Sequence, residues 1–141
     1  MIKEVVNYIA ANTTLTLNTD LFAIAVDPKS DVDECIIVAE PSPGLVDGLL
    51  ADKRQIPLVA YSRAKTRFTA RDNAYTVFNL FTWGASDKFH GNTQISLTAI
   101  GSGPVYVCNF VCNIPYYVGL DESGKRFVYS MPVGVTVTNM I

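Results

Sequence analysis

The densest group of side chains that could do chemistry is an acidic turn with four carboxylates: Asp27, Asp31, Asp33 and Glu34. Carboxylate oxygens crowded in this way could hold a hard cation such as Ca²⁺. The spacing is not that of an EF-hand, because Lys29 interrupts the acids and the glycine of such a loop is missing. We therefore expect a solvated acidic turn without a metal ion, and contact with another protein as the next interpretation.

Three cysteines and one histidine are the other candidates for metal binding or nucleophilic chemistry. On a regular strand Cys108 and Cys112 would share a face about 13 Å apart, too far for one metal ion or a disulfide. Cys35 lies in another apolar segment, so we expect three buried, reduced thiols, as suits a reducing cytoplasm. His90 follows a polar stretch with no evident partner and is interpreted as a surface residue.

Sequence motifs of known enzyme classes are not found in the chain. Gly101-Ser102-Gly103 has the composition of a turn, and there is no Walker loop, Gly-x-Gly-x-x-Gly fingerprint or zinc-type cluster. A catalytic site would have to be formed by residues distant in the sequence. We expect a protein that is not an enzyme and binds no cofactor. A small-molecule-binding module and an enzyme without recognised motifs remain the alternatives.

A basic group accompanies the acidic one at an expected junction of strand and helix: Arg63, Lys65, Arg67 and Arg71. One interpretation is simple solvation of four surface cations. The other is contact with an acidic surface, such as the turn from Asp27 to Glu34 on an adjacent identical subunit. The sequence leaves both interpretations open.

Composition limits the partners of the chain. Charged residues are 17% of 141 and the formal net charge is −2, so neutralisation of phosphates does not favour binding to nucleic acid. No run approaches the roughly 18 apolar residues of a membrane span, and no secretion signal is evident. The hydrophobic content of 49% is high for a solitary soluble protein. We expect one domain, residues 1–141, that contacts other subunits.

Apolar periodicity predicts two helices, over residues 2–11 and about 69–83. In the second, Thr69 and Asp72 have the spacing of a capping box. Strands are expected at 21–26, 34–40, 54–61, 94–100, 105–114 and 126–137, with a long loop over 41–53. Pro57 suggests an edge position or an irregularity in its strand. The predicted fold class is α+β, with a mostly antiparallel or mixed sheet of about five to six strands packed with two main helices.

The end of the chain, from Ile114 to Ser130, predicts a strand, a tight turn and a second strand. Asp121 can bond the backbone two residues on, and Gly124 can adopt the left-handed conformation that closes such a hairpin. Arg126 then opens the last strand. From residue 127 onward alternate residues are apolar, which predicts one face in the core and one small, polar face.

This closing segment resembles a family of small siphophage proteins described as minor capsid, tail completion or tail terminator proteins. The similarity lies in a Pro, a Gly a few residues later, and then Asp-x-x-Gly-[Lys/Arg]-Arg-aromatic. Two further stretches are similar to parts of that family: Asn18-Thr19-Asp20-Leu21-Phe22, and Arg63-Ala64-Lys65-Thr66 with the helix over 70–81.

The resemblance implies a structural virion protein, assembled in the host cytoplasm. It would form a homo-oligomeric ring, a hexamer, that caps the head-proximal end of a long non-contractile tail tube. Its partners would be itself, the major tail tube protein and a head-completion or connector protein, without direct nucleic-acid or membrane binding. The acidic turn and the basic group are the candidate interface residues for the subunit or the tube. Another protein of the head-to-tail connection is the alternative.

Overall fold

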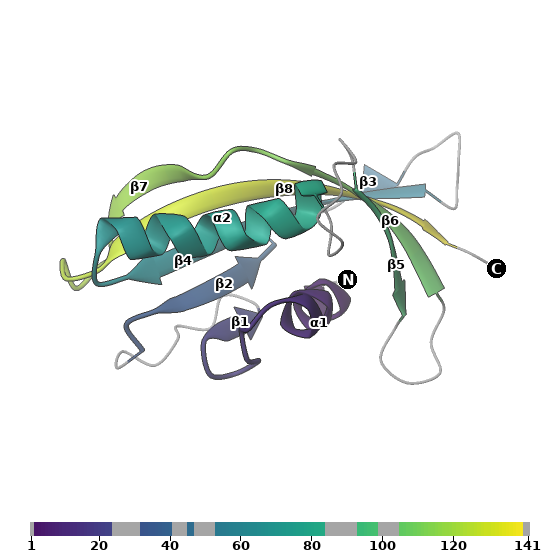
Figure 1. Ribbon diagram of the computed structural model, residues 1–141. Helices are drawn as coiled ribbons and strands as arrows, with labels where there is room; N and C mark the ends of the chain where they lie inside the picture. The colour runs from purple at the N-terminus through teal and green to yellow at the C-terminus, as the bar shows by residue number, and fades with distance from the viewer. Residues whose placement is uncertain are drawn as a thin grey trace.

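The computed structural model describes residues 2–23, 32–40, 45–46, 53–83, 93–98 and 105–139. Two helices, α1 (Ile2–Asn12) and α2 (Arg67–Trp83), pack against a mixed sheet, and α2 runs along its central strands (Figure 1). The predicted α+β class is therefore confirmed. Neither described helix is long and apolar enough to cross a membrane.

The strands are β1 (Leu21–Ala23), β2 (Cys35–Ala39), β3 (Leu45–Val46), β4 (Lys53–Ala64), β5 (Thr93–Thr98), β6 (Val105–Cys112), β7 (Tyr116–Leu120) and β8 (Phe127–Asn139). The sheet order is β1-β2-β4-β8-β6-β5, with β3 on β4 and β7 on β8. The β1–β2 pair is parallel, and the other pairs are antiparallel. The strand β3 corrects the prediction of an uninterrupted loop over 41–53.

A long ribbon of β4 and β8 forms the centre of the sheet, from Lys53 opposite Thr138 to Ala64 opposite Phe127. The strand as a whole is not at an edge, because β4 lies between β8 and β2. The β4–β8 register is also regular at Pro57, which is opposite Gly134, so the predicted irregularity is not found there. Described partners on the other side of β4 end at Gln55 with β3 and resume at Val59 with β2, so no described strand pairs with that side of Pro57.

Pro132 occupies the matching position on β8. There β7 pairs up to Ser130, and β6 pairs from Val133 onward. The carbonyl of Pro132 accepts a hydrogen bond from the Asn113 backbone N–H at 3.0 Å, in the link between β6 and β7. Both prolines therefore lie where the central ribbon changes its outer partner, and neither interrupts the pairing of β4 with β8.

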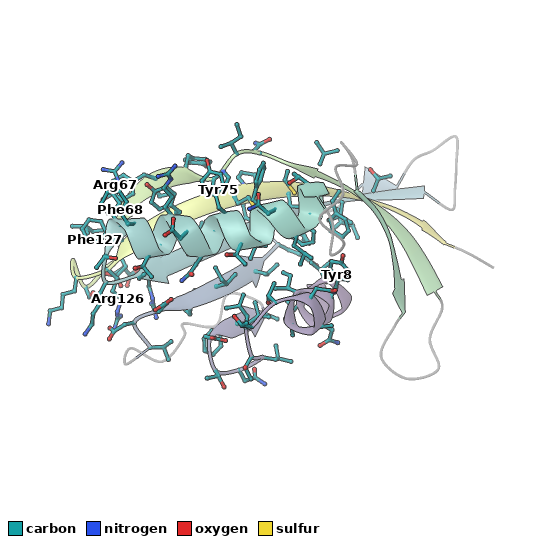
Figure 2. The ribbon with its side chains drawn as sticks, in the orientation of Figure 1. Tyr8, Arg67, Phe68, Tyr75, Arg126 and Phe127 are labelled. Atoms are coloured by element: carbon teal, nitrogen blue, oxygen red, sulfur yellow. The ribbon has the colours of Figure 1, made fainter. Side chains whose placement is uncertain are left out.

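The core lies between the helices and one face of the sheet. Phe81 of α2 stacks on Phe110 of β6 at 4.5 Å between ring centroids, and Tyr8 of α1 stacks on Phe81 at 6.4 Å (Figure 2 labels Tyr8). The alternation predicted for the last strand is confirmed at its core positions: Tyr129, Met131, Val133 and Val135 are buried. Ser130, on the opposite face, is also buried, which the pattern did not predict.

The start of α2 differs from the predicted capping box. Thr66 precedes the helix, and its Oγ1 accepts a hydrogen bond from the Thr69 backbone N–H at 3.2 Å. Thr66 is thus the N-cap residue, whereas Thr69 already lies in the first turn, where the predicted cap cannot form. The side-chain oxygens of the two threonines lie 2.7 Å apart.

Candidate interaction surface

The β7–β8 turn has the predicted left-handed glycine, but the Asp121 side chain bonds the Ser123 hydroxyl and not, as predicted, the backbone two residues on. Gly124 has a φ of 70°, the left-handed conformation, and its N–H donates to the carbonyl of Asp121 at 2.9 Å. The N–H of Asp121 donates to the carbonyl of Arg126 at 2.9 Å and closes the turn. The Ser123 hydroxyl donates to Oδ1 of Asp121 at 2.6 Å. The residues that carry the family resemblance therefore have defined roles in the backbone of this turn.

An ion-pair network joins this turn to the predicted acidic and basic groups. Arg126 Nε lies 2.9 Å from Oδ1 of Asp33, and Lys65 Nζ lies 3.1 Å from its Oδ2. Arg126 also reaches Oδ2 of Asp121 at 3.5 Å. Asp33 and Lys65, considered above as contacts between subunits, thus meet within one chain. Asp27 and Asp31 lie outside the described residues.

The network holds both carboxyl groups in their charged form. The pKa of Asp33 lies below its usual value, first because of the hydrogen bond from Arg126 and then that from Lys65. Burial of Asp121 tends to raise the pKa of its carboxyl group. The hydrogen bonds from Ser123 and from the Arg126 backbone, together with the positive charge of Arg126, outweigh burial, so the pKa is lowered. The pKa of Arg126 is raised, chiefly by its hydrogen bond to Asp33.

Arg63 does not belong to the exposed basic group, since only 8% of its surface is accessible. Ser62 points toward α2 and bonds the Ala70 carbonyl, so Arg63 lies on the other face of β4, paired with Cys35 of β2. Its guanidinium donates to the carbonyl of Val32. Burial raises the pKa of the Cys35 thiol, and the charge of Arg63 partly offsets this effect.

Two other basic residues contact aromatic rings. The Arg67 guanidinium lies 4.3 Å from the centroid of the Tyr117 ring, and its Nε donates to the Tyr129 hydroxyl at 3.3 Å. Arg71 lies 5.5 Å from the centroid of Tyr75 on the same helix. Such cation–π contacts are worth about 0.5–1 kcal/mol at exposed sites. The acidic turn also reaches this helix, because Glu34 accepts a hydrogen bond from Asn73 at 2.7 Å.

Near these cations, β7 and the elements beside it carry a set of exposed apolar side chains that was not predicted from the sequence. Its members, called the β7 edge surface here, are Phe68, Val111, Ile114, Tyr116, Tyr117, Val118 and Leu120. Phe68 is 74% exposed and Ile114 66%. Figure 2 shows Phe68 beside Arg67 and Phe127, at the end of the molecule where α2 begins. The signal was present in the run from Ile114 to Leu120, which carries no charge and does not alternate.

Groups suited to catalysis or metal binding do not converge in the part of the chain that is described. No three His, Cys, Asp or Glu residues there are placed to hold a metal ion. Cys35 and Cys112 are free thiols, and burial raises the pKa of Cys112 to about 12. His90 and the side chain of Cys108 lie outside the described residues, so the reduced state of all three cysteines stays a prediction.

The β7 edge surface combines tyrosine, phenylalanine and aliphatic side chains with a neighbouring arginine. This composition is typical of the centres of protein–protein contacts, where Tyr and Arg are enriched. The ion-paired turn beside it fixes the strand that displays these side chains. The chain matches no protein-family model and no curated protein.

Proposed function

We propose that this protein is a structural virion component that caps the head-proximal end of a long non-contractile phage tail tube. In this proposal copies of the chain form a closed ring, a hexamer, that ends tube growth and provides the surface for head joining. The partners are the chain itself, the major tail tube protein and a head-completion protein. The protein acts in the virion after assembly in the host cytoplasm, through contacts and not through catalysis.

The observation that carries this proposal is the hairpin that resembles the siphophage family and its position beside the β7 edge surface. Gly124 and Arg126 of the motif fix the turn, and Arg126 ties it to Asp33. The strand entering the turn carries Tyr116, Val118 and Leu120, each more than half exposed. A rigid turn that displays apolar side chains suits a protein whose work is assembly.

The test is deletion of the gene from its phage, with imaging of the lysate by electron microscopy. We expect tails of abnormal length together with filled heads that carry no tail, and rescue by the wild-type gene supplied from a plasmid. Tails of normal length beside unjoined heads would instead assign the chain to another connector of head and tail. Normal infectious virions without the chain would overturn the proposal.

A further inference from the structure

The geometry points to a two-fold dimer of the free protein, in which β7 of one copy pairs antiparallel with β7 of a second copy. This inference does not rest on the proposed function. A two-fold contact closes at two copies, whereas a ring requires a head-to-tail contact. The dimer would therefore cover β7 in the free protein.

The first argument is the open edge of β7. Within the described residues β7 pairs only with β8. The outer edge of β1, by contrast, is closed by its own turn, since Asn18 N–H donates to the Leu21 carbonyl and Leu21 N–H to the Thr16 carbonyl. Proteins usually protect an exposed edge with charged side chains or a bulge. Residues 114–120 carry no charge, and β7 has only a bulge between Tyr117 and Gly119.

The second argument is that β7 is apolar on both faces of the sheet. Tyr117 is opposite Tyr129 on the face covered by α2, while Tyr116 is opposite Ser130 on the other face. A strand with one face in water usually alternates apolar and polar residues, whereas a strand whose two faces are both covered is apolar throughout. The residues of β7 have the second pattern.

The third argument is the size of the apolar surface. An aromatic side chain presents about 150–250 Å². On that scale, and with less for Val, Leu and Ile, the side chains of the β7 edge surface together expose on the order of 700 Å², divided between the two faces of the sheet. A standard interface uses roughly 800 Å² on each partner. Among the side chains whose exposure is described, Leu17 is the one large exposed hydrophobic residue outside this surface. Of those side chains, the β7 edge surface is the largest apolar complement that a second copy offers.

The fourth argument is the order of charges along the strand. Arg67 lies over Tyr117 near the start of β7, and Asp121 and Glu122 follow its end. Antiparallel pairing centred on Val118 places Tyr116 of one copy opposite Leu120 of the other. The same register brings Arg67 of each copy toward the acidic end of the other strand, twice by symmetry. Opposite charges then meet on both sides of the two-fold axis.

The position of Val118 at the axis provides the test, because the same residue of both copies meets there. No residue of β8 lies opposite it, and its side chain is 55% exposed, so substitution should leave the fold intact. We expect wild-type protein to dimerise in sedimentation velocity at concentrations up to about 1 mM. Val118→Asp and Val118→Lys should each raise the dimer dissociation constant about 100-fold, because like charges face one another.

An equal mixture of the two variants should restore dimers, since Asp and Lys then meet across the axis. Leu17→Asp, a matched change outside the surface, should dimerise like wild type. Circular dichroism and thermal unfolding of each variant show that loss of dimer is not loss of fold. Arg67→Glu and Glu122→Arg should each weaken the dimer, and the double variant, with the charges exchanged, should recover it.

Three outcomes would overturn the inference. One is wild-type protein that stays monomeric over the whole concentration range. Another is dimerisation that Val118→Asp does not affect, or that the mixture of variants fails to restore. The third is a larger assembly that depends on Val118, which would indicate a head-to-tail contact. Protection of the β7 amides from hydrogen exchange only after addition of purified tail tubes would also contradict the dimer. These outcomes concern the dimer alone. The proposed function is tested separately, by deletion of the gene.

Discussion

At the scale of residues, the side chains that fix the surface act through distant partners. Arg126 joins Asp33, which lies far earlier in the chain, to Asp121 of its own turn. Arg67 connects α2 to both strands of the hairpin, through the ring of Tyr117 and the hydroxyl of Tyr129. These contacts fix the position of β7 and of the apolar side chains that it carries.

Acid should weaken the ion pairs of Asp33 and Asp121 and so lower the stability of the fold. The pKa values of Asp33 and Asp121 are lower in the folded protein than the 3.8 of an unperturbed carboxyl group. Their ionised forms therefore stabilise the fold fully above that value, and the contribution is lost as the pH falls through the lower, folded pKa. Asp33→Asn should be less stable than wild type at pH 7. The gap in unfolding free energy, measured by urea titration, should close below pH 3.8. A constant gap down to pH 2 would contradict this account.

Replacement of Gly124 by Val should cost on the order of 1 kcal/mol or more. The φ of 70° is unfavourable for a branched side chain, although an added Cβ would meet no atom within 4 Å. The cost is thus conformational and not a clash with neighbours. Gly124→Asn is the control, because Asn tolerates the left-handed region better than Val. Equal melting temperatures for wild type and Gly124→Val would show that the turn does not need this conformation.

At the scale of elements, the Thr66 hydroxyl caps the start of α2. The strands β4 and β8 form a ribbon, and each of them contains a proline. The ribbon accepts these prolines because its outer partners change at the same positions. The helix connects directly to the end of β4 through residues 65 and 66. The cap therefore fixes where α2 starts and where Arg67 and Phe68 are displayed.

Thr66→Ala should reduce stability by about 1 kcal/mol, the usual cost of losing an N-cap hydroxyl. Asp72→Ala is the matched control for the rejected capping box and should have a much smaller effect. Chemical denaturation of both variants measures the difference. A larger loss for Asp72→Ala than for Thr66→Ala would mean that the helix start is fixed by the acid and not by the hydroxyl.

At the scale of the whole molecule, the sheet is firmly held at its centre, whereas β7 lies at an outer edge. The backbone of β4 pairs with β8 along its entire length, and the buried Leu58, Ala60, Met131 and Val133 lie on this ribbon. The outer edge of β7 has no described partner strand in the single chain. We therefore expect local unfolding to occur more readily at β7 than at β4 and β8.

Hydrogen exchange should therefore be slowest at the amides of β4 and β8. In dilute protein the β7 amides that point away from β8 should exchange fast, and dimerisation should slow them. The comparison is made at two protein concentrations on either side of the dissociation constant, with the β4 amides as internal reference. Slow exchange of all β7 amides in the monomer would show that this edge is already covered within one chain.

Features that depend on near neighbours in the chain could be predicted from the sequence. Helical spacing predicted both helices, alternation predicted the core face of β8, and Asp121 with Gly124 predicted the turn, because each signal arises within a few residues. The predicted cap at Thr69 was wrong, because Thr66 provides the cap and Thr69 already lies within the helix. The α+β class followed from the order of these elements.

Contacts across the sheet could not be predicted in this way, because they depend on how the strands are arranged in the folded protein. Pairing with Cys35 buries Arg63, which the sequence placed in an exposed basic group, and the approach of Asp33 to Arg126 spans most of the chain. The exposure of β7 depends on sheet order, because the same apolar run would be buried on a central strand. A sequence records local preference, whereas burial and ion pairing depend on register and on segments brought together by the fold.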